Sequence, residues 1–267
     1  MMRTETAPRT VVEVRGLEKH YGAGGRRHAG GSVTRALDHV SFAVDAGEFV
    51  GIMGPSGSGK STLLNCLATI DAPTAGRISV GGREVTGLSG AELAKFRRDE
   101  LGFVFQDANL LDTLTAFENV ALALTIQRVP AREVEGRVHA AARTLGIEDV
   151  LPKYPYQLSG GQRQRVAAAR ATVGSPSLVL ADEPTGALDS KSARQLLESF
   201  SALNGMGATI LMVTHDSTAA SYCSRILFIK DGRLMGELRR QAADRAAFYR
   251  KIVEVVTDMG EGACDAR

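Results

Sequence analysis

The sequence contains only three cysteines, and they lie far apart. Cys66, Cys223 and Cys264 match neither a Cys-x-x-Cys pair nor a Cys/His spacing, which argues against a zinc site and against a disulfide framework. We therefore interpret the three residues as buried or unreactive thiols of a cytosolic protein.

The chain also lacks an excess of either charge. Its 32 basic and 30 acidic residues give a formal net charge of +2, which is too small for the general basic field of a nucleic-acid-binding protein. We therefore expect no direct DNA or RNA partner.

Long apolar runs are absent as well. No run approaches the roughly 18 residues that a membrane-spanning helix needs, and residues 1–10 contain no apolar signal core. We therefore predict a cytoplasmic protein whose membrane role, if it has one, depends on a partner. The 267 residues are enough to bury a sizeable core, and one globular unit with a subdomain is favoured over two domains.

Two apolar patterns indicate two kinds of strand. Alternating residues at 11–14, 40–44 and 78–80 are typical of half-exposed strands, whereas the unbroken runs 49–53, 178–181 and 209–213 are typical of strands covered on both faces. Each unbroken run precedes polar residues and a helical pattern. We therefore predict an α/β fold with a parallel-sheet core and an N-terminal antiparallel β subdomain, and we expect ligands at the carboxyl ends of the parallel strands.

The pattern becomes helical between residues 107 and 160. Thr115 and Glu118 have the spacing of a capping box, and apolar residues follow at helical spacing as far as Leu145. We predict a helical subdomain inserted at about 107–160 into a domain that spans 11–238, followed by a C-terminal helix and tail over 239–267. Within that segment the helix is expected at 241–258.

Two loops are also expected. Asp231-Gly232 predicts a hairpin between two short apolar runs. The Gly- and Arg-rich stretch 22–31 is interpreted as a loop between the first two strands, without a function.

A glycine-rich loop directly follows the apolar run 49–53. Its sequence is Gly54-Pro55-Ser56-Gly57-Ser58-Gly59-Lys60-Ser61, and Thr62 continues into a helical pattern. This is the strand, loop and helix context of a phosphate-binding loop. Its amides are expected to surround the β-phosphate of ATP, while Lys60 neutralises the β- and γ-phosphates and Ser61 ligates Mg²⁺. The much less favoured alternative is a glycine-rich turn with a surface lysine.

A second anion-binding helix start is predicted about a hundred residues later. The pentapeptide Leu158-Ser159-Gly160-Gly161-Gln162 has the capping-box spacing between Ser159 and Gln162, and its two glycines leave the first amides of the helix uncovered. Together, the two helix starts indicate an ATPase that holds nucleotide between two copies of itself.

Polar residues at the ends of apolar strands are candidates for the reaction. Asp182 ends a buried run and is predicted to hold Mg²⁺, and Glu183 is predicted to polarise the attacking water. His215 follows the run 209–213 and is predicted to contact the γ-phosphate. Two adjacent acids are more often a solvated turn and a lone histidine is more often structural, but the complete phosphate loop reverses that preference for the acids.

Two further residues are weaker candidates. Gln106 follows the apolar run Phe103-Val104-Phe105 and is predicted to touch Mg²⁺ or water while it senses movement of the helical insert. Tyr21 is predicted to stack on adenine through its ring, and packing at the end of a strand is its equally frequent alternative.

In their order along the chain, these motifs resemble the full set of the ATP-binding cassette (ABC) ATPases, over about residues 11–235. The resemblance implies a head-to-tail homodimer, in which Ser159, Gly160 and Gly161 of one copy close over ATP held by Lys60 of the other. It also implies that Asp189 lies in the segment that crosses the interface, and a helix cap before Ser190 is its structural alternative.

Three other segments, 67–71, 93–98 and 105–114, are similar to those of the bacitracin-type antimicrobial-peptide transporters. These belong to a subgroup that also includes macrolide-exporter, lipoprotein-release and cell-division types. The resemblance implies a separate FtsX-like permease, a sensor histidine kinase as a further partner, and a position on the inner face of the membrane through the permease.

The function that we predict is an ATPase subunit whose closure on ATP moves the helical subdomain and, through it, a membrane permease; the resemblance implies resistance to antimicrobial peptides as the outcome. Three alternatives to this function remain. The first is the ATPase of a lipoprotein-release or cell-division complex. The second is a soluble cassette protein of DNA repair or translation, which would usually carry paired cassettes or a long coiled-coil insertion. The third is a regulator that binds ATP but hardly hydrolyses it, and the presence of Glu183 and His215 disfavours it.

Overall fold

The computed structural model describes residues 9–22, 33–241 and 243–261 of the chain. Most of the predicted loop at 22–31 lies outside these ranges, as do Cys264 and the rest of the last six residues. Cys66 and Cys223 are buried and free, as the sequence predicts. Burial raises the pKa of Cys66 to about 11, so its thiol stays protonated and unreactive near neutral pH.

A six-stranded sheet forms the centre of the molecule, with the strand order β10-β9-β3-β8-β7-β6. Its first five strands in chain order run parallel, and only β10 is antiparallel, to β9. The strands are β3 (Phe49–Met53), β6 (Leu101–Val104), β7 (Leu178–Asp182), β8 (Ile210–Val213), β9 (Arg225–Lys230) and β10 (Arg233–Arg239).

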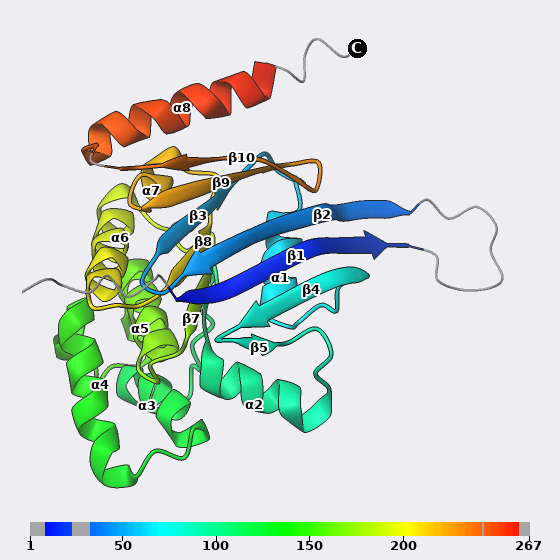
Figure 1. Ribbon diagram of the computed structural model, residues 1–267. Coiled ribbons are helices and arrows are strands. Elements are labelled where there is room, and N and C mark those ends of the chain that lie inside the picture. The colour runs from blue at the N-terminus through cyan, green and yellow to red at the C-terminus, as the bar shows by residue number, and fades with distance from the viewer. Residues whose placement is uncertain (1–8, 23–32, 242, 262–267) are drawn as a thin grey trace, which may run out of the picture.

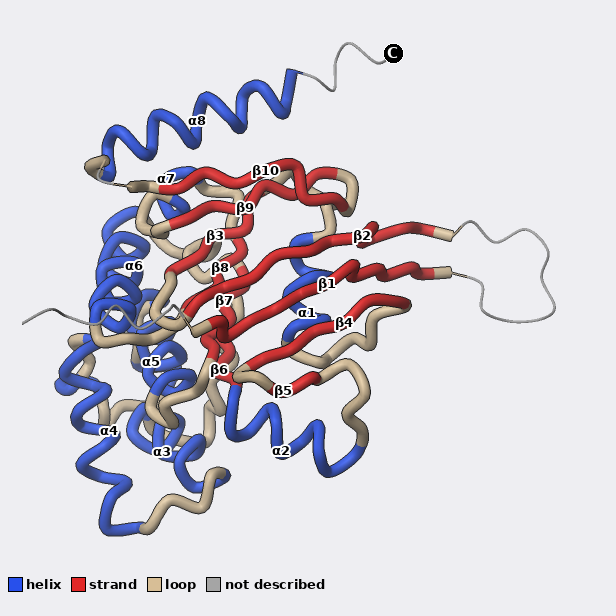
Figure 2. Tube along the Cα trace, in the orientation of Figure 1, coloured by secondary structure: helices blue, strands red, loops and turns tan. Residues whose placement is uncertain are grey.

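A four-stranded antiparallel sheet lies beside it, with the order β2-β1-β4-β5. Figure 2 shows the two sets of strands in red, with the four helices α3 to α6 gathered on one side. The strands of the second sheet are β1 (Thr10–Tyr21), β2 (Thr34–Asp45), β4 (Ala75–Val80) and β5 (Arg83–Glu84). The predicted fold class, a parallel core with an N-terminal antiparallel sheet, is confirmed.

The helices cover the sheets and form a separate lobe. They are α1 (Lys60–Leu67), α2 (Gly90–Glu100), α3 (Ala116–Ile126), α4 (Ala131–Leu145), α5 (Gly160–Thr172), α6 (Ser190–Gly205), α7 (Ser217–Ala220) and α8 (Arg245–Glu261). Helices α3 and α4 lie at the end of the molecule opposite to α8 (Figure 1). Along the described stretches, no helix is both long enough and apolar enough to span a membrane.

Strand β3 shows why an unbroken apolar run marks a central strand. Val50 and Ile52 join a core cluster shared with the antiparallel sheet and α1, whereas Phe49 and Met53 join a cluster shared with α3 to α6. Because both faces are covered, every residue of the strand is buried.

The parallel register places the carboxyl ends of the central strands at one level. Val213 of β8 is opposite Ile52 of β3 on one side and opposite Asp182 of β7 on the other. The segments that follow these three strands therefore begin side by side, at the edge where the sequence predicts the ligand.

Two local predictions are confirmed by hydrogen bonds and backbone angles. The hydroxyl of Thr115 accepts a bond from the amide of Glu118, whose carboxylate accepts one from the amide of Thr115 in return, so a capping box opens α3. Asp231 and Gly232 connect β9 to β10 with φ values of 49° and 75°, the positive values that a tight hairpin turn requires.

The predicted start of the terminal helix is wrong. The helix begins at Arg245 rather than at 241, and it runs to Glu261 rather than 258. The carboxylate of Asp244 accepts a hydrogen bond from the amide of Ala247 at 2.6 Å, and this contact fixes the first turn.

Both ends of α8 are attached to the body of the protein. The guanidinium of Arg245 lies 4.3 Å from the ring centroid of Tyr222, and the ammonium of Lys230 donates to the carbonyl of Met259.

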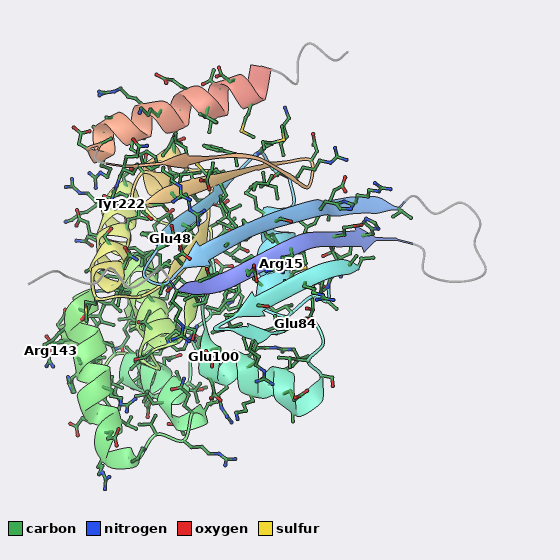
Figure 3. All side chains as sticks on the ribbon, viewed as in Figure 1. Arg15, Glu48, Glu84, Glu100, Arg143 and Tyr222 are labelled. Carbon is green, nitrogen blue, oxygen red and sulfur yellow. The ribbon has the colours of Figure 1, made fainter. Side chains whose placement is uncertain are left out.

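The buried Arg225, at the start of β9, donates to the carboxylates of Glu48 and Glu237. Figure 3 labels Glu48 where the chain passes from β2 into β3, and it also labels Tyr222.

Candidate active site

The glycine-rich loop lies tightly between β2 and β9. A Cβ atom at Gly54 would lie 2.0 Å from the carbonyl oxygen of Ile229, and one at Gly59 would lie 2.3 Å from that of Ala36. Gly59 also has a φ of 99°, which L-residues rarely adopt. Only glycine fits at these two positions, so the loop can pack this closely against β2 and β9.

Lys60 occupies the centre of this loop. Its ammonium donates to the carbonyls of Gly54 and Pro55, each at 2.8 Å, and the residue is only 8% exposed. Burial lowers the pKa of Lys60, against the opposing charges of Glu183 and Asp182. Its direct hydrogen-bond acceptors are neutral, so a phosphate group would give this buried cation a charged partner.

The hydroxyl of Ser58 is buried beside Gly54, on the side of the loop that packs against β9. Ser58 is 2% exposed, and its oxygen has no hydrogen-bond partner. Buried polar atoms without partners are rare in folded proteins.

Ser61 and Asp182 supply the oxygen atoms that Mg²⁺ prefers. The hydroxyl of Ser61 donates to Oδ1 of Asp182 at 3.5 Å. Burial, and then the neighbouring charge of Glu183, raises the pKa of Asp182. A divalent cation at these two side chains would offset that cost, so hydroxyl and carboxylate together fit the metal.

Glu183 has a strained backbone, and its side chain contacts His215. Its φ is 44°, in the left-handed region, and its amide donates to the carbonyl of Val213 at 2.9 Å. One carboxylate oxygen lies 2.8 Å from Nδ1 of His215, and the other accepts from the amide of His215 at 3.3 Å. The two residues therefore form a fixed pair at the strand ends.

The loop and this pair line one cleft of about 530 Å³. The lining residues are Thr34, Arg35, Ala36, Ser56, Gly57, Gly59, Lys60, Ser61, Thr62, Glu183 and His215. Residues 34–36 belong to the start of β2, and the sequence analysis missed them. Only the folded register of β1 against β2 could reveal them, because no motif marks them in the sequence.

Tyr21 lies next to this cleft but does not line it. It pairs with Thr34 in the β1–β2 register, and its hydroxyl donates to Asp71 at 2.6 Å. The ammonium of Lys19 lies 4.8 Å from the centroid of its ring. Stacking of Tyr21 on adenine therefore remains a prediction.

Gln106 lies in a second cleft of about 240 Å³, which it shares with Gly160 and Leu188. Its side-chain nitrogen packs against Gly186, where a Cβ atom would be 3.1 Å away. The structure thus brings Gln106 to the turn that follows Glu183, and not to the lining of the phosphate cleft.

The second predicted helix start is also present, at the beginning of α5. The hydroxyl of Ser159 accepts from the amide of Gln162 at 3.2 Å, and the amide of Ser159 donates to Gln162 at 2.9 Å, so the capping box is confirmed. Gly161 packs against Ser192, where a Cβ atom would be 2.7 Å away. In a single chain, this helix start does not line the cleft of Lys60.

Asp189 caps α6, which is the structural alternative that the sequence left open. Its carboxylate accepts from the amides of Lys191 and Ser192, each at 3.0 Å. A contact between copies through Asp189 remains a prediction.

Known proteins resemble this chain over most of its length. The ABC transporter family matches residues 37–186. The ABC transporter ATP-binding protein YvcR of Bacillus subtilis is 54% identical over 227 residues, which are 85% of this chain and 87% of YvcR. The bacitracin export ATP-binding protein BceA of Halalkalibacterium halodurans is 46% identical over 251 residues, which are 94% of this chain and 97% of BceA.

A solved structure is similar in fold and in sequence. The dimeric ABC transporter cassette MJ0796 has a TM-score of 0.77 and 39% identity, over 86% of this chain and 99% of its own. The same cassette in a dimeric post-hydrolysis state, bound to ADP and Pi, has a TM-score of 0.76, with the same identity and coverage.

Proposed function

The chain belongs to the ABC transporter family and is an ATPase, and from this premise we propose that it is the nucleotide-binding subunit of an exporter that works with a separate FtsX-like permease. One observation carries the nucleotide-binding part of the proposal. The buried ammonium of Lys60 and the pair of Glu183 with His215 line a single cleft at the carboxyl ends of the parallel strands.

Each residue has a part in hydrolysis that follows from its position. When bound, MgATP supplies the γ-phosphoryl group and a cation that neutralises its charge. Lys60 would bind the phosphates, and Ser61 and Asp182 would hold the metal. Glu183 accepts a proton from the attacking water, and His215 orients that carboxylate through the 2.8 Å contact. Catalysis is chiefly positioning and charge stabilisation.

A second copy of the chain completes the site. The amides of Gly160 and Gly161 begin α5 away from the cleft of their own chain, so they can bind the phosphates of ATP on a partner, next to the Ser159 side chain that caps the helix. The dimeric arrangement of MJ0796, at 39% identity, supports a homodimer. Gln162 would hold the helix start in place, and Asp189 would contact the other copy.

The proposed cargo is an antimicrobial peptide of the bacitracin type, as a step in resistance. Its support is the 46% identity to a bacitracin export ATP-binding protein over 94% of this chain. The permease would contact the surface near 106–118, which includes the exposed Leu111, and would hold this subunit at the inner face of the membrane. A sensor histidine kinase would complete the assembly.

An affinity pull-down from native membranes tests this proposal. The bait carries Glu183→Gln, which is expected to bind ATP but to stall hydrolysis, and Glu198→Gln, on the exposed face of α6, is the matched control. We expect the first bait, with ATP, to recover a large permease with an extracellular domain. Recovery of ribosomes or DNA-repair factors without a membrane protein would rule out the transporter function and leave only the ATPase.

A further inference from the structure

Helix α5 holds the backbone of the segment 105–109 through two side chains. Gln164 is 2% exposed, and its amide nitrogen donates to the carbonyls of Phe105, at 2.9 Å, and of Gln106. Its amide oxygen is buried without a partner. An unpaired buried oxygen destabilises the protein. The two bonds that the Gln164 nitrogen donates to these carbonyls offset part of that cost.

Arg170, further along the same helix, holds the other end of the segment. Its guanidinium donates to the carbonyls of Ala108 and Asn109, at 2.9 and 2.8 Å. Burial lowers the pKa of this arginine. Hydrogen bonds from a desolvated guanidinium are stronger than those between neutral groups. Four carbonyls of one short segment are thus bound by two side chains of a single helix.

The segment has little regular structure of its own. Residues 105–110 lie outside every helix and strand, and Asn109 has a φ of 47°, in the left-handed region. Its path therefore depends on side-chain contacts from its neighbours, and α5 supplies those from Gln164 and Arg170.

The same helix connects three parts of the molecule. It is capped by Ser159, it packs against α3 and α4 of the helical lobe, and through Gln164 it holds the backbone of Gln106. The Gln106 side chain in turn contacts Gly186, whose amide donates to the carbonyl of Glu183 at 2.9 Å. A shift of α5 would therefore displace Gln106 relative to Glu183.

We propose that Gln164 and Arg170 are positioning residues that make the segment 105–109 and α5 move as one body. The placement of Gln106 beside the Glu183 turn is then set by the helix whose first residues face the second copy of the chain. This inference rests on the contact of Gln106 with Mg²⁺ or water that the sequence predicts, and on the proposed role of Glu183 in hydrolysis.

A double-mutant cycle in ATP hydrolysis tests whether Gln164 acts through Gln106. The variants are Gln164→Leu, Gln106→Ala and the combination of both. If positioning is the role, Gln164→Leu lowers kcat about tenfold with KM for ATP little changed, since misplaced catalytic groups cost up to about a hundredfold. The combined variant is then no slower than Gln106→Ala alone.

A second arginine of α5 provides a matched control. Arg165 donates to Gln195 of α6 and makes no hydrogen bond to the segment, so Arg165→Met is expected to keep the wild-type kcat. Arg170→Met is expected to lower kcat as Gln164→Leu does, and Arg170→Lys to restore part of it. Arg170→Met also carries the test if Gln164→Leu does not fold, as judged by its thermal melting curve.

The possible failures are distinct. If Gln106→Ala lowers kcat but Gln164→Leu and Arg170→Met both leave it unchanged, this inference is overturned and the proposed function is not. The inference is also overturned if Gln164→Leu lowers kcat by the same factor in the wild-type protein and in the Gln106→Ala variant, because Gln164 then acts independently of Gln106. A wild-type kcat in Gln106→Ala overturns the proposed role of Gln106, and the inference with it.

Discussion

The change Glu183→Gln tests the central chemistry of the site with almost no change in size. The carboxylate lies 2.8 Å from Nδ1 of His215 and also accepts the amide of His215, and glutamine can keep the second contact. What it loses is the ability to accept a proton. Loss of a general base lowers kcat by about 10²- to 10⁴-fold, which corresponds to about 3–5 kcal/mol in the activation free energy.

Binding of ATP is expected to survive this change. Lys60 and the loop amides are untouched, and a cleft that receives the anionic nucleotide loses one negative charge, so the affinity for MgATP should stay the same or rise. Phosphate release at saturating ATP gives kcat, and equilibrium binding of the nucleotide gives the affinity. Glu198→Gln removes only an exposed ion pair to Arg194 and should behave as wild type. A kcat within about threefold of wild type would show that Glu183 is not the base, since even a modest general base contributes far more.

Three further changes test the packing and electrostatics around the site. Gly102→Ala places a Cβ atom 2.0 Å from the carbonyl oxygen of Ala171. We expect the free energy of unfolding to fall by about 1–3 kcal/mol, which lowers the urea midpoint. An unchanged midpoint would mean that β6 and α5 separate easily. Arg225→Met leaves the carboxylates of Glu48 and Glu237 without their buried partner. We expect the free energy of unfolding to fall by about 3 kcal/mol, and not by more, because these carboxylates still reach some water. The same urea assay measures this loss, and a gain in stability would contradict it. Hydrogen bonds from His39 and Arg233 lower the pKa of Asp38 to about 2 from 3.8, so this carboxylate contributes stability above about pH 4 that is lost as the pH falls towards 2. The variant Asp38→Asn should therefore lose less stability than wild type between pH 4 and 2, and equal losses in acid unfolding curves would refute this assignment.

The parallel core and its ligand edge could be predicted because they depend on local patterns. The run 178–181 is apolar at every position because both faces of β7 are covered. The change to Asp182 and Glu183 then marks the point where the strand reaches the cleft. The capping box at Ser159 is equally local, since its two partners are three residues apart.

The parts that the sequence did not reveal depend on contacts between distant segments. Residues 34–36 line the cleft only because β2 pairs with β1 and passes the loop, so that the carbonyl of Ala36 meets Gly59. The start of α8 was misplaced because capping by Asp244 competes with a helical pattern that extends further back. The Gln106 side chain lies against Gly186, and its backbone is bound by Gln164 of α5, about 60 residues away in the sequence.

Two perturbed groups, Lys60 after β3 and Asp182 at the end of β7, explain why the site would take nucleotide and metal as one unit. Burial lowers the pKa of Lys60 and raises that of Asp182, so each charge is disfavoured where it stands. Free nucleotide would relieve Lys60 but add negative charge near Asp182 and Glu183, and a cation alone would relieve Asp182 but oppose Lys60. Only a ligand that places a negative charge at the loop and a positive charge at the end of β7 relieves both residues together. We therefore expect MgATP to bind more tightly than either component alone, because of where β3 and β7 end.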